Sequence, residues 1–120
     1  EETKAEQPEP LSSEEIEKLV QKALQVLPEK VEHYARIIGV TYGRITIRNQ
    51  KTRWGSCSSK GNLNFNCQLM RLPEELQDYV VVHELCHRKE MNHSSDFWKE
   101  VEYIMPDYQE RRARLKQVRV

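Results

Sequence analysis

The chain has 120 residues, of which 32% are charged, with 19 acidic and 19 basic side chains. This length supports one domain with one modest core, and the balanced net charge identifies no class of partner by itself. No run is long and apolar enough to span a bilayer, so we expect no membrane partner. The three cysteines, at positions 57, 67 and 86, are an odd and widely spaced set that is not typical of a secreted disulfide framework. We therefore expect a reducing, cytoplasmic location.

The N-terminal third of the sequence predicts helices. Residues 1–11 are acidic, polar and proline-containing, and we expect a flexible lead-in there, followed by a single domain over residues 12–120. Ser12 or Ser13 is expected to cap a helix whose apolar positions repeat every 3.6 residues. Pro28 either ends this helix or starts a second one, which would run to about Ile38 and end at Gly39.

The middle of the sequence predicts a short antiparallel sheet. After residue 40 the apolar period changes to two, and residues 44–48 read as a strand. Residues 52–58 form a second extended piece, with a hairpin turn expected at 59–62. Residues 62–69 alternate between apolar and amide side chains and predict a third strand. We expect its asparagines to face solvent, although one of them could support a metal ligand.

The most informative stretch is His83-Glu84-Leu85-Cys86-His87, an H-E-x-x-H pattern in a helix that we expect to run from Pro73 to about Glu90 or Met91. Positions four apart share one face of a helix, so His83 and His87 can direct two imidazoles to one point, with Glu84 beside it. Two neutral imidazoles suit zinc, and the adjacent carboxylate suits a general base. Hydrogen-bonded core histidines are the alternative.

A third histidine, His93, follows after five intervening residues. To return it to the other two, the chain must turn back after Met91, and Asn92 can adopt the left-handed conformation that such a turn uses. His93 is therefore expected as the third ligand, the alternative being a surface histidine beside a helix cap. Metzincin proteases share this spacing but place glycine where this chain has Glu90, so we do not assign it to them.

Three imidazoles with one open position are typical of a catalytic zinc site rather than a structural one. Glu84 would then act as general base toward water and pass the proton to the leaving amine. The group that stabilises the oxyanion is not assigned, and Tyr79, Tyr103 and His33 are the candidates. Ser94 or Ser95 is expected to cap the next helix, and Pro106 separates it from a last, basic helix.

Basic residues dominate the segment between Glu32 and Glu74, which contains no aspartate or glutamate. The cations are Arg36, Arg44, Arg48, Lys51, Arg53, Lys60 and Arg71. They indicate either a solvated sheet edge, which we prefer, or a surface for nucleic acid or an acidic substrate. Arg53 could contact substrate or fix a carboxylate, and we favour a structural role for it.

Five segments, residues 52–58, 61–66, 79–87, 92–98 and 106–108, resemble the YgjP-like metallopeptidase domain family. The resemblance spans roughly residues 30–115. It implies a small zincin-like fold related to the SprT-like metalloproteases, one zinc ion held by His83, His87 and His93, and Glu84 as catalytic base. Members commonly have tryptophan where this chain has Cys67, and many carry an upstream β-rich region that this sequence does not include. Some have been labelled nucleotide pyrophosphatases.

The sequence thus predicts an α+β fold with N-terminal helices, a short antiparallel sheet, the H-E-x-x-H helix and C-terminal helices. The expected function is that of a monomeric zinc metallopeptidase that acts on a peptide or protein of unknown identity. The alternatives are a metal-dependent nucleotide pyrophosphatase or phosphohydrolase, and a nucleic-acid-associated zinc protein, since the basic stretch allows weak nucleic-acid association.

Overall fold

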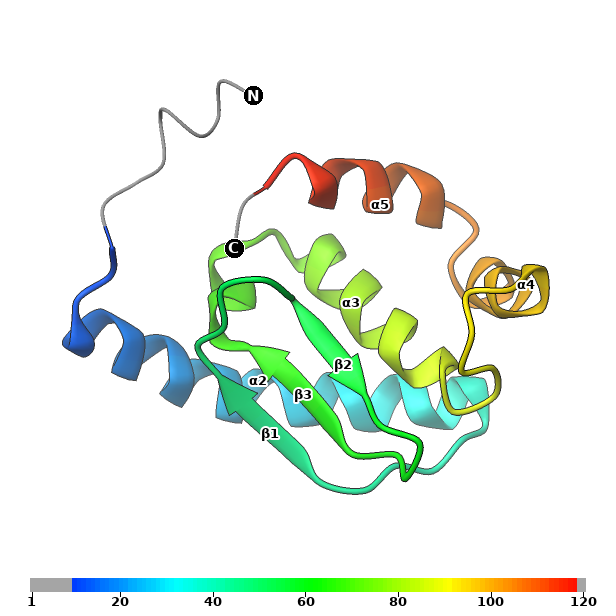
Figure 1. Ribbon diagram of the computed structural model, residues 1–120, viewed down its shortest axis with the longest axis horizontal. Helices are drawn as coiled ribbons and strands as arrows, with labels where there is room; N and C mark the ends of the chain where they lie inside the picture. The colour runs from blue at the N-terminus through cyan, green and yellow to red at the C-terminus, as the bar shows by residue number, and fades with distance from the viewer. Residues whose placement is uncertain (1–9, 119–120) are drawn as a thin grey trace.

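The computed structural model describes residues 10–118, so nearly all of the predicted lead-in lies outside the described residues. The elements are α2 (Ser13–Ile38), β1 (Ile45–Arg48), β2 (Gly55–Cys57), β3 (Leu63–Asn66), the 3-10 helix η1 (Cys67–Arg71), α3 (Glu74–Cys86), α4 (Ser95–Ile104) and α5 (Tyr108–Lys116). Helices and a small sheet pack together (Figure 1), which confirms the predicted α+β class. No helix in residues 10–118 has the length and apolar character that a membrane crossing requires.

Helix α2 is one continuous helix, not two. Its N-terminus is closed by a capping box in which Ser12 and Glu15 exchange side-chain-to-backbone hydrogen bonds, and Gly39 ends it at φ 85°. Pro28 lies inside the helix, where an interior proline costs about 3 kcal/mol. Buried residues on both sides of Pro28, Leu27 and Val31 among them, belong to one core. Tertiary packing of both halves offsets the local cost.

The sheet has the order β1-β3-β2 and is mixed, so the prediction of a wholly antiparallel sheet is wrong. β2 and β3 form the expected antiparallel hairpin, but β1 pairs parallel to the other side of β3, with Ile45 opposite Leu63. The reason is the segment between β1 and β2, which carries the chain from one edge of β3 to the other. Local alternation predicts strands but not which of them become neighbours.

Strand β3 ends at Asn66, three residues earlier than predicted, and its continuation coils into η1. The Asn66 side chain accepts a hydrogen bond from the Gln68 backbone N–H and so caps η1. Its amide nitrogen donates to the carbonyl oxygens of Gln50 and Arg53 at 2.9 and 3.0 Å. Asn66 is fully buried, so the expectation of a solvent-facing side chain is wrong here. It instead fixes the segment that joins β1 to β2.

Helix α3 occupies the centre of the molecule. It packs against α2, runs beside β2, and contacts α5 on its other side (Figure 1). Val81, Val82, Leu85 and Cys86 on this helix are completely buried. Two arginines of α5 hold that helix to the start of α3, since Arg111 donates to the Glu75 carbonyl oxygen and Arg114 pairs with the Glu75 carboxylate. The motif helix therefore has a fixed position between β2 and α5.

Candidate metal centre

The H-E-x-x-H residues lie on the last turn and a half of α3. Leu85 and Cys86 anchor the helix in the core, while His83 and His87 emerge on a different face. The helix ends at Cys86, with His87 as its C-cap, earlier than the predicted end at Glu90 or Met91. The next residues wind more tightly, because the Arg88 and Lys89 N–H groups bond three residues back. His87 keeps helical dihedrals, so it still shares a face with His83.

The loop after α3 brings His93 back to the other two histidines, as the spacing predicted. The proposed left-handed turn at Asn92 is not used, because no non-glycine residue within 10–118 has a positive φ. The chain reverses through bends at Met91 and Asn92 instead. Ser94 then caps α4 by accepting a hydrogen bond from the Phe97 N–H, in agreement with the prediction. This cap fixes the residue next to His93.

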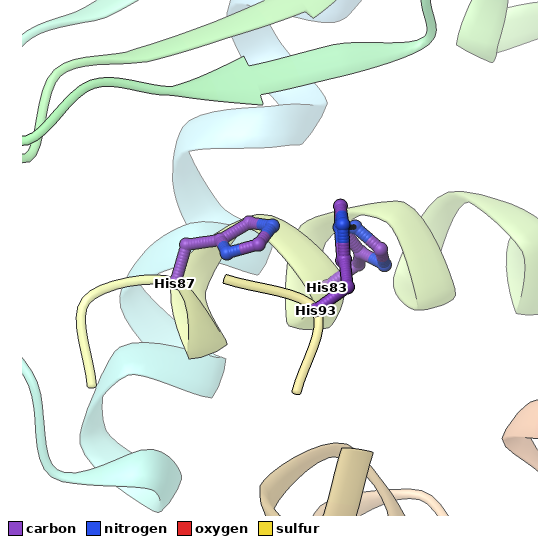
Figure 2. Close-up of side chains that lie close together, drawn as sticks. All are labelled: His83, His87 and His93. Carbon is purple, nitrogen blue, oxygen red and sulfur yellow. Dashed lines mark hydrogen bonds between the residues drawn. The ribbon is translucent and has the colours of Figure 1, made fainter. Parts of the chain in front are cut away.

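The three imidazoles converge on one point. Figure 2 shows His83 and His87 rising from α3 and His93 reaching them from the returning loop. One ring nitrogen from each lies within 4.8 Å of the other two, and the Nε2 atoms of His83 and His93 are 3.2 Å apart. Two nitrogens bound tetrahedrally to zinc at 2.0–2.1 Å would be about 3.3 Å apart. The geometry therefore fits a single small metal ion.

The nitrogens that face away from this point also have partners. His87 Nδ1 lies 3.0 Å from the Glu90 carbonyl oxygen, which can only accept, so Nδ1 carries the proton and donates it. His83 Nδ1 lies 3.3 Å from the Tyr79 hydroxyl oxygen. Both arrangements leave Nε2 free to bind a metal, and such outer partners usually orient metal-ligating histidines. The three imidazoles therefore fit a metal ion both in the distances between their nitrogens and in the partners of the outer nitrogens of His83 and His87.

Burial keeps the helical imidazoles neutral, as metal ligation requires. Desolvation, followed by the neighbouring His87 and His93 rings, lowers the pKa of His83 to about 3. Desolvation is also the main cause that lowers the pKa of His87. Phe97 from α4 contributes to this burial, because its ring centroid lies 4.4–5.1 Å from the centroids of all three imidazoles. The apolar wall thus favours uncharged nitrogen donors.

Glu84 is buried beside the cluster, with only 7% of its surface exposed. Desolvation raises the pKa of its carboxyl to about 7, and the charge of Arg53 opposes that shift. The strand β2 passes directly over its side chain, since a Cβ on Gly55 would lie 3.3 Å from Glu84 Cγ. A carboxyl that titrates near neutrality can both accept and release a proton.

The candidates for oxyanion stabilisation have different positions. Tyr79 is at the site, but it is buried and its hydroxyl faces His83. Tyr103 is 84% exposed and lines a different pocket, with Ile37 and Lys99. His33 lines another surface depression, between α2 and α3. Neither is part of the histidine cluster.

Arg112 of α5 lines a pocket together with His83 and Glu84, a position that was not predicted from the sequence. No spacing signal links position 112 to the motif, because the contact depends on how α5 packs against α3. One role considered for Arg53 was to fix a carboxylate, such as that of Asp96 or Asp107, but Asp107 pairs with Arg111. Within residues 10–118, no carboxylate lies within 4.0 Å of Arg53.

Comparison with known families decides the classification. The model of the YgjP-like metallopeptidase domain matches residues 1–118, almost the whole chain. The chain belongs to the YgjP-like metallopeptidase domain family. No curated protein sequence matches it.

Two solved structures resemble this YgjP-like chain. The metallopeptidase zymogen of Pyrococcus abyssi abylysin is 31% identical, with a TM-score of 0.70, over 77% of this chain and 93% of that one. The metallopeptidase zymogen of Methanocaldococcus jannaschii jannalysin is 24% identical, with a TM-score of 0.65, over 75% and 93% of the two chains. The second likeness establishes the fold alone. Family membership identifies a metal-dependent peptidase domain, as the sequence resemblance implied.

Proposed function

We propose that this chain is a zinc metallopeptidase in which His83, His87 and His93 hold the metal and Glu84 is the general base. The convergence of three imidazole nitrogens within 4.8 Å carries the proposal. Three imidazoles with no thiolate and no carboxylate form the ligand set of a catalytic zinc site. The free cysteines support this choice, because Cys86 is buried on α3 and Cys57 lies on β2, and neither belongs to the cluster.

A bound zinc ion would supply Lewis-acid chemistry that polarises a peptide carbonyl and makes water acidic near neutral pH. The side chain of Glu84 takes the proton of the water whose oxygen forms a bond to the carbonyl carbon. When the carbon–nitrogen bond breaks, Glu84 returns that proton to the leaving amine nitrogen. Its pKa of about 7 suits both transfers. The hydrogen bonds at Nδ1 of His83 and His87 hold those rings in place during the reaction.

The free edge of strand β2 is the proposed binding site for the substrate main chain. The sheet order leaves β2 with a free edge, and this strand runs next to α3 and Glu84. An extended peptide can pair with an exposed strand edge through main-chain hydrogen bonds. Because β3 is the central strand of the sheet, β2 is the strand of the hairpin that can bind substrate in this way.

Metal analysis of the purified chain is the decisive experiment. We expect one zinc ion per chain, lost in His83→Ala and in His93→Ala. His33→Ala is the matched control, because His33 is the fourth histidine and lies outside the cluster. Zinc binding that survives His93→Ala would overturn the three-histidine site.

The role of Glu84 requires a separate assay. Zinc-loaded protein and its Glu84→Gln variant are incubated with a mixture of unstructured peptides, and cleavage is followed by mass spectrometry. We expect cleavage by the wild type and a loss of about 10²–10⁴-fold in Glu84→Gln, with zinc retained. Cleavage at the wild-type rate by Glu84→Gln would show that another group is the base.

The phosphohydrolase and nucleic-acid alternatives gain no support from the site. Their motive was the acid-free basic stretch, yet Arg36 in that stretch pairs with Glu32. Two arginines of the basic last helix pair with Asp107 and Glu75. These three arginines therefore form ion pairs within the fold, either along one helix or between two helices. Nucleotide hydrolysis that depends on Glu84 would restore the phosphohydrolase alternative.

A further inference from the structure

A pocket opens beside the histidine cluster, between α3, β2 and α5. It has a volume of about 240 Å³. Its lining includes Val80, His83, Glu84, Arg112, Leu115 and Lys116. Most of its wall is apolar, and His83 and Glu84 form one side. The pocket therefore borders the residues proposed to act on the cleaved bond.

Two cations of α5, Arg112 and Lys116, line the same pocket. The guanidinium carbon of Arg112 lies 4.9 Å from the centroid of the Trp98 ring, so the side chain has a defined position. The Trp98 ring also stacks on Tyr108, at 5.3 Å, and on His93, at 5.9 Å. Arg112 is thus held next to a ring that contacts two of the three histidines, His83 and His93.

Across residues 10–118, no carboxylate oxygen lies within 4.0 Å of Arg112 or Lys116. Their neighbours on α5 differ, because Arg111 pairs with Asp107 and Arg114 pairs with Glu75. The helix therefore uses one set of cations for packing and presents another set to the pocket. Glu84 is the one acidic residue in the lining.

We infer that this pocket selects substrates in which an apolar side chain is accompanied by a carboxylate, which Arg112 binds with Lys116 beside it. An arginine guanidinium can bind a carboxylate through two parallel hydrogen bonds. The inference rests on the proposed peptidase function and names its substrate class. The carboxylate can belong to an acidic side chain or to the C-terminus of a short peptide.

Four peptides that differ only in this group test the inference. The first has a free C-terminus, the second a C-terminal amide, the third an internal glutamate, and the fourth glutamine at that position, the last two with amidated ends. We expect kcat/KM of the wild type to be about tenfold higher for one charged peptide than for its neutral counterpart. The pair that shows the difference identifies the source of the carboxylate.

The Arg112→Gln variant assigns the preference to its residue. It should raise KM for the charged peptide about tenfold more than KM for the neutral peptide. Arg114→Gln is the matched control on the same helix, because Arg114 pairs with Glu75 and does not line the pocket. Equal losses on all four peptides would overturn the inference, since they would indicate a role in the reaction itself or in folding. The inference would also be overturned if Arg112→Gln raised kcat/KM equally for all four peptides. It would likewise be overturned if the wild type cleaved charged and neutral peptides with the same kcat/KM.

Equilibrium binding separates this inference from the proposed function. Zinc-loaded Glu84→Gln protein is titrated with the same peptides by calorimetry, with and without Arg112→Gln. We expect Kd to be about tenfold lower for the charged peptide, and this difference to vanish in the double variant. If the charged peptide binds in this way while the wild type cleaves no peptide, the carboxylate subsite stands and the peptidase proposal fails. Equal Kd values for charged and neutral peptides refute the subsite.

Discussion

Gly55 of β2 lies so close to Glu84 of α3 that a Cβ at position 55 would be 3.3 Å from Glu84 Cγ. The same Cβ would be 3.1 Å from the Asn64 carbonyl oxygen on the neighbouring strand. The edge strand and the proposed base are therefore in direct contact, with no side chain between them. A side chain at position 55 therefore has to shift the Glu84 side chain, the Phe65 ring or the neighbouring strand.

Gly55→Ala should reduce activity without removing the metal. Since the added methyl group pushes on Glu84, we expect kcat/KM for peptide cleavage to fall roughly tenfold to a hundredfold, because small misplacements of a catalytic group have effects of this size. Zinc content should stay at the wild-type value. Ser56→Ala, on the same strand, is the control and should retain activity. An unchanged kcat/KM in Gly55→Ala would show that this contact does not position Glu84.

Tyr79→Phe tests the partner of His83. The variant keeps the buried ring and removes the hydroxyl that lies 3.3 Å from His83 Nδ1. Loss of such an outer partner typically weakens metal binding by about 10- to 100-fold, and we expect that effect on the zinc Kd, measured by competition with a chelator. Tyr103→Phe removes a hydroxyl from an exposed ring and should leave Kd unchanged. Equal Kd values for the two variants would refute the role of Tyr79.

Arg88 joins the metal-binding turn to the rest of the fold. Its Nε donates to the Thr41 carbonyl oxygen at 2.8 Å, and its guanidinium packs on Gly61, where a Cβ would lie 2.7 Å from the guanidinium carbon. Gly61 has a φ of 89°, a left-handed conformation that favours glycine.

We therefore expect Arg88→Ala to lower the free energy of unfolding by about 2 kcal/mol, since hydrogen bonds to charged groups contribute roughly that amount. Urea unfolding of the metal-free chain measures it. The control is Arg44→Ala, because Arg44 is exposed, and the expected change there is below about 0.5 kcal/mol. The interpretation fails if the two variants have the same stability.

Local signals in the sequence account for the elements that were predicted well. Ser12, Gly39 and Ser94 are caps whose chemistry acts within a few residues; Gly39 was predicted, and each serine was one of two adjacent candidates. The pairing of His83 with His87 is a consequence of helical periodicity alone. The approach of His93 followed from a short loop, although the assumed left-handed turn at Asn92 was wrong.

Contacts between distant segments account for the errors. Pro28 stays helical because a core formed by other elements covers both halves of α2. Asn66 is buried because it binds a segment that begins sixteen residues earlier, at Gln50. The proximity of Arg112 to His83 depends on the docking of α5, which no local pattern predicts. Tertiary structure overrides local preference at each of these positions.

Lys30 of α2 should make stability depend on pH in the alkaline range. Its Nζ lies 2.6 Å from Asp78 and 3.2 Å from Glu74, both on α3. Desolvation lowers its pKa, but the two carboxylates outweigh that effect and raise the pKa above its usual value. The stabilisation is therefore complete below about pH 10.5, the unfolded pKa, and is lost as pH rises through the higher folded pKa. In urea unfolding, Lys30→Gln should be roughly 1–2 kcal/mol less stable than the wild type at pH 8, with a smaller difference at pH 12. Lys22→Gln, at an exposed position of the same helix, should be as stable as the wild type at both pH values. If the stability difference between Lys30→Gln and the wild type were the same at pH 12 as at pH 8, the proposed role of the Lys30 charge would be contradicted.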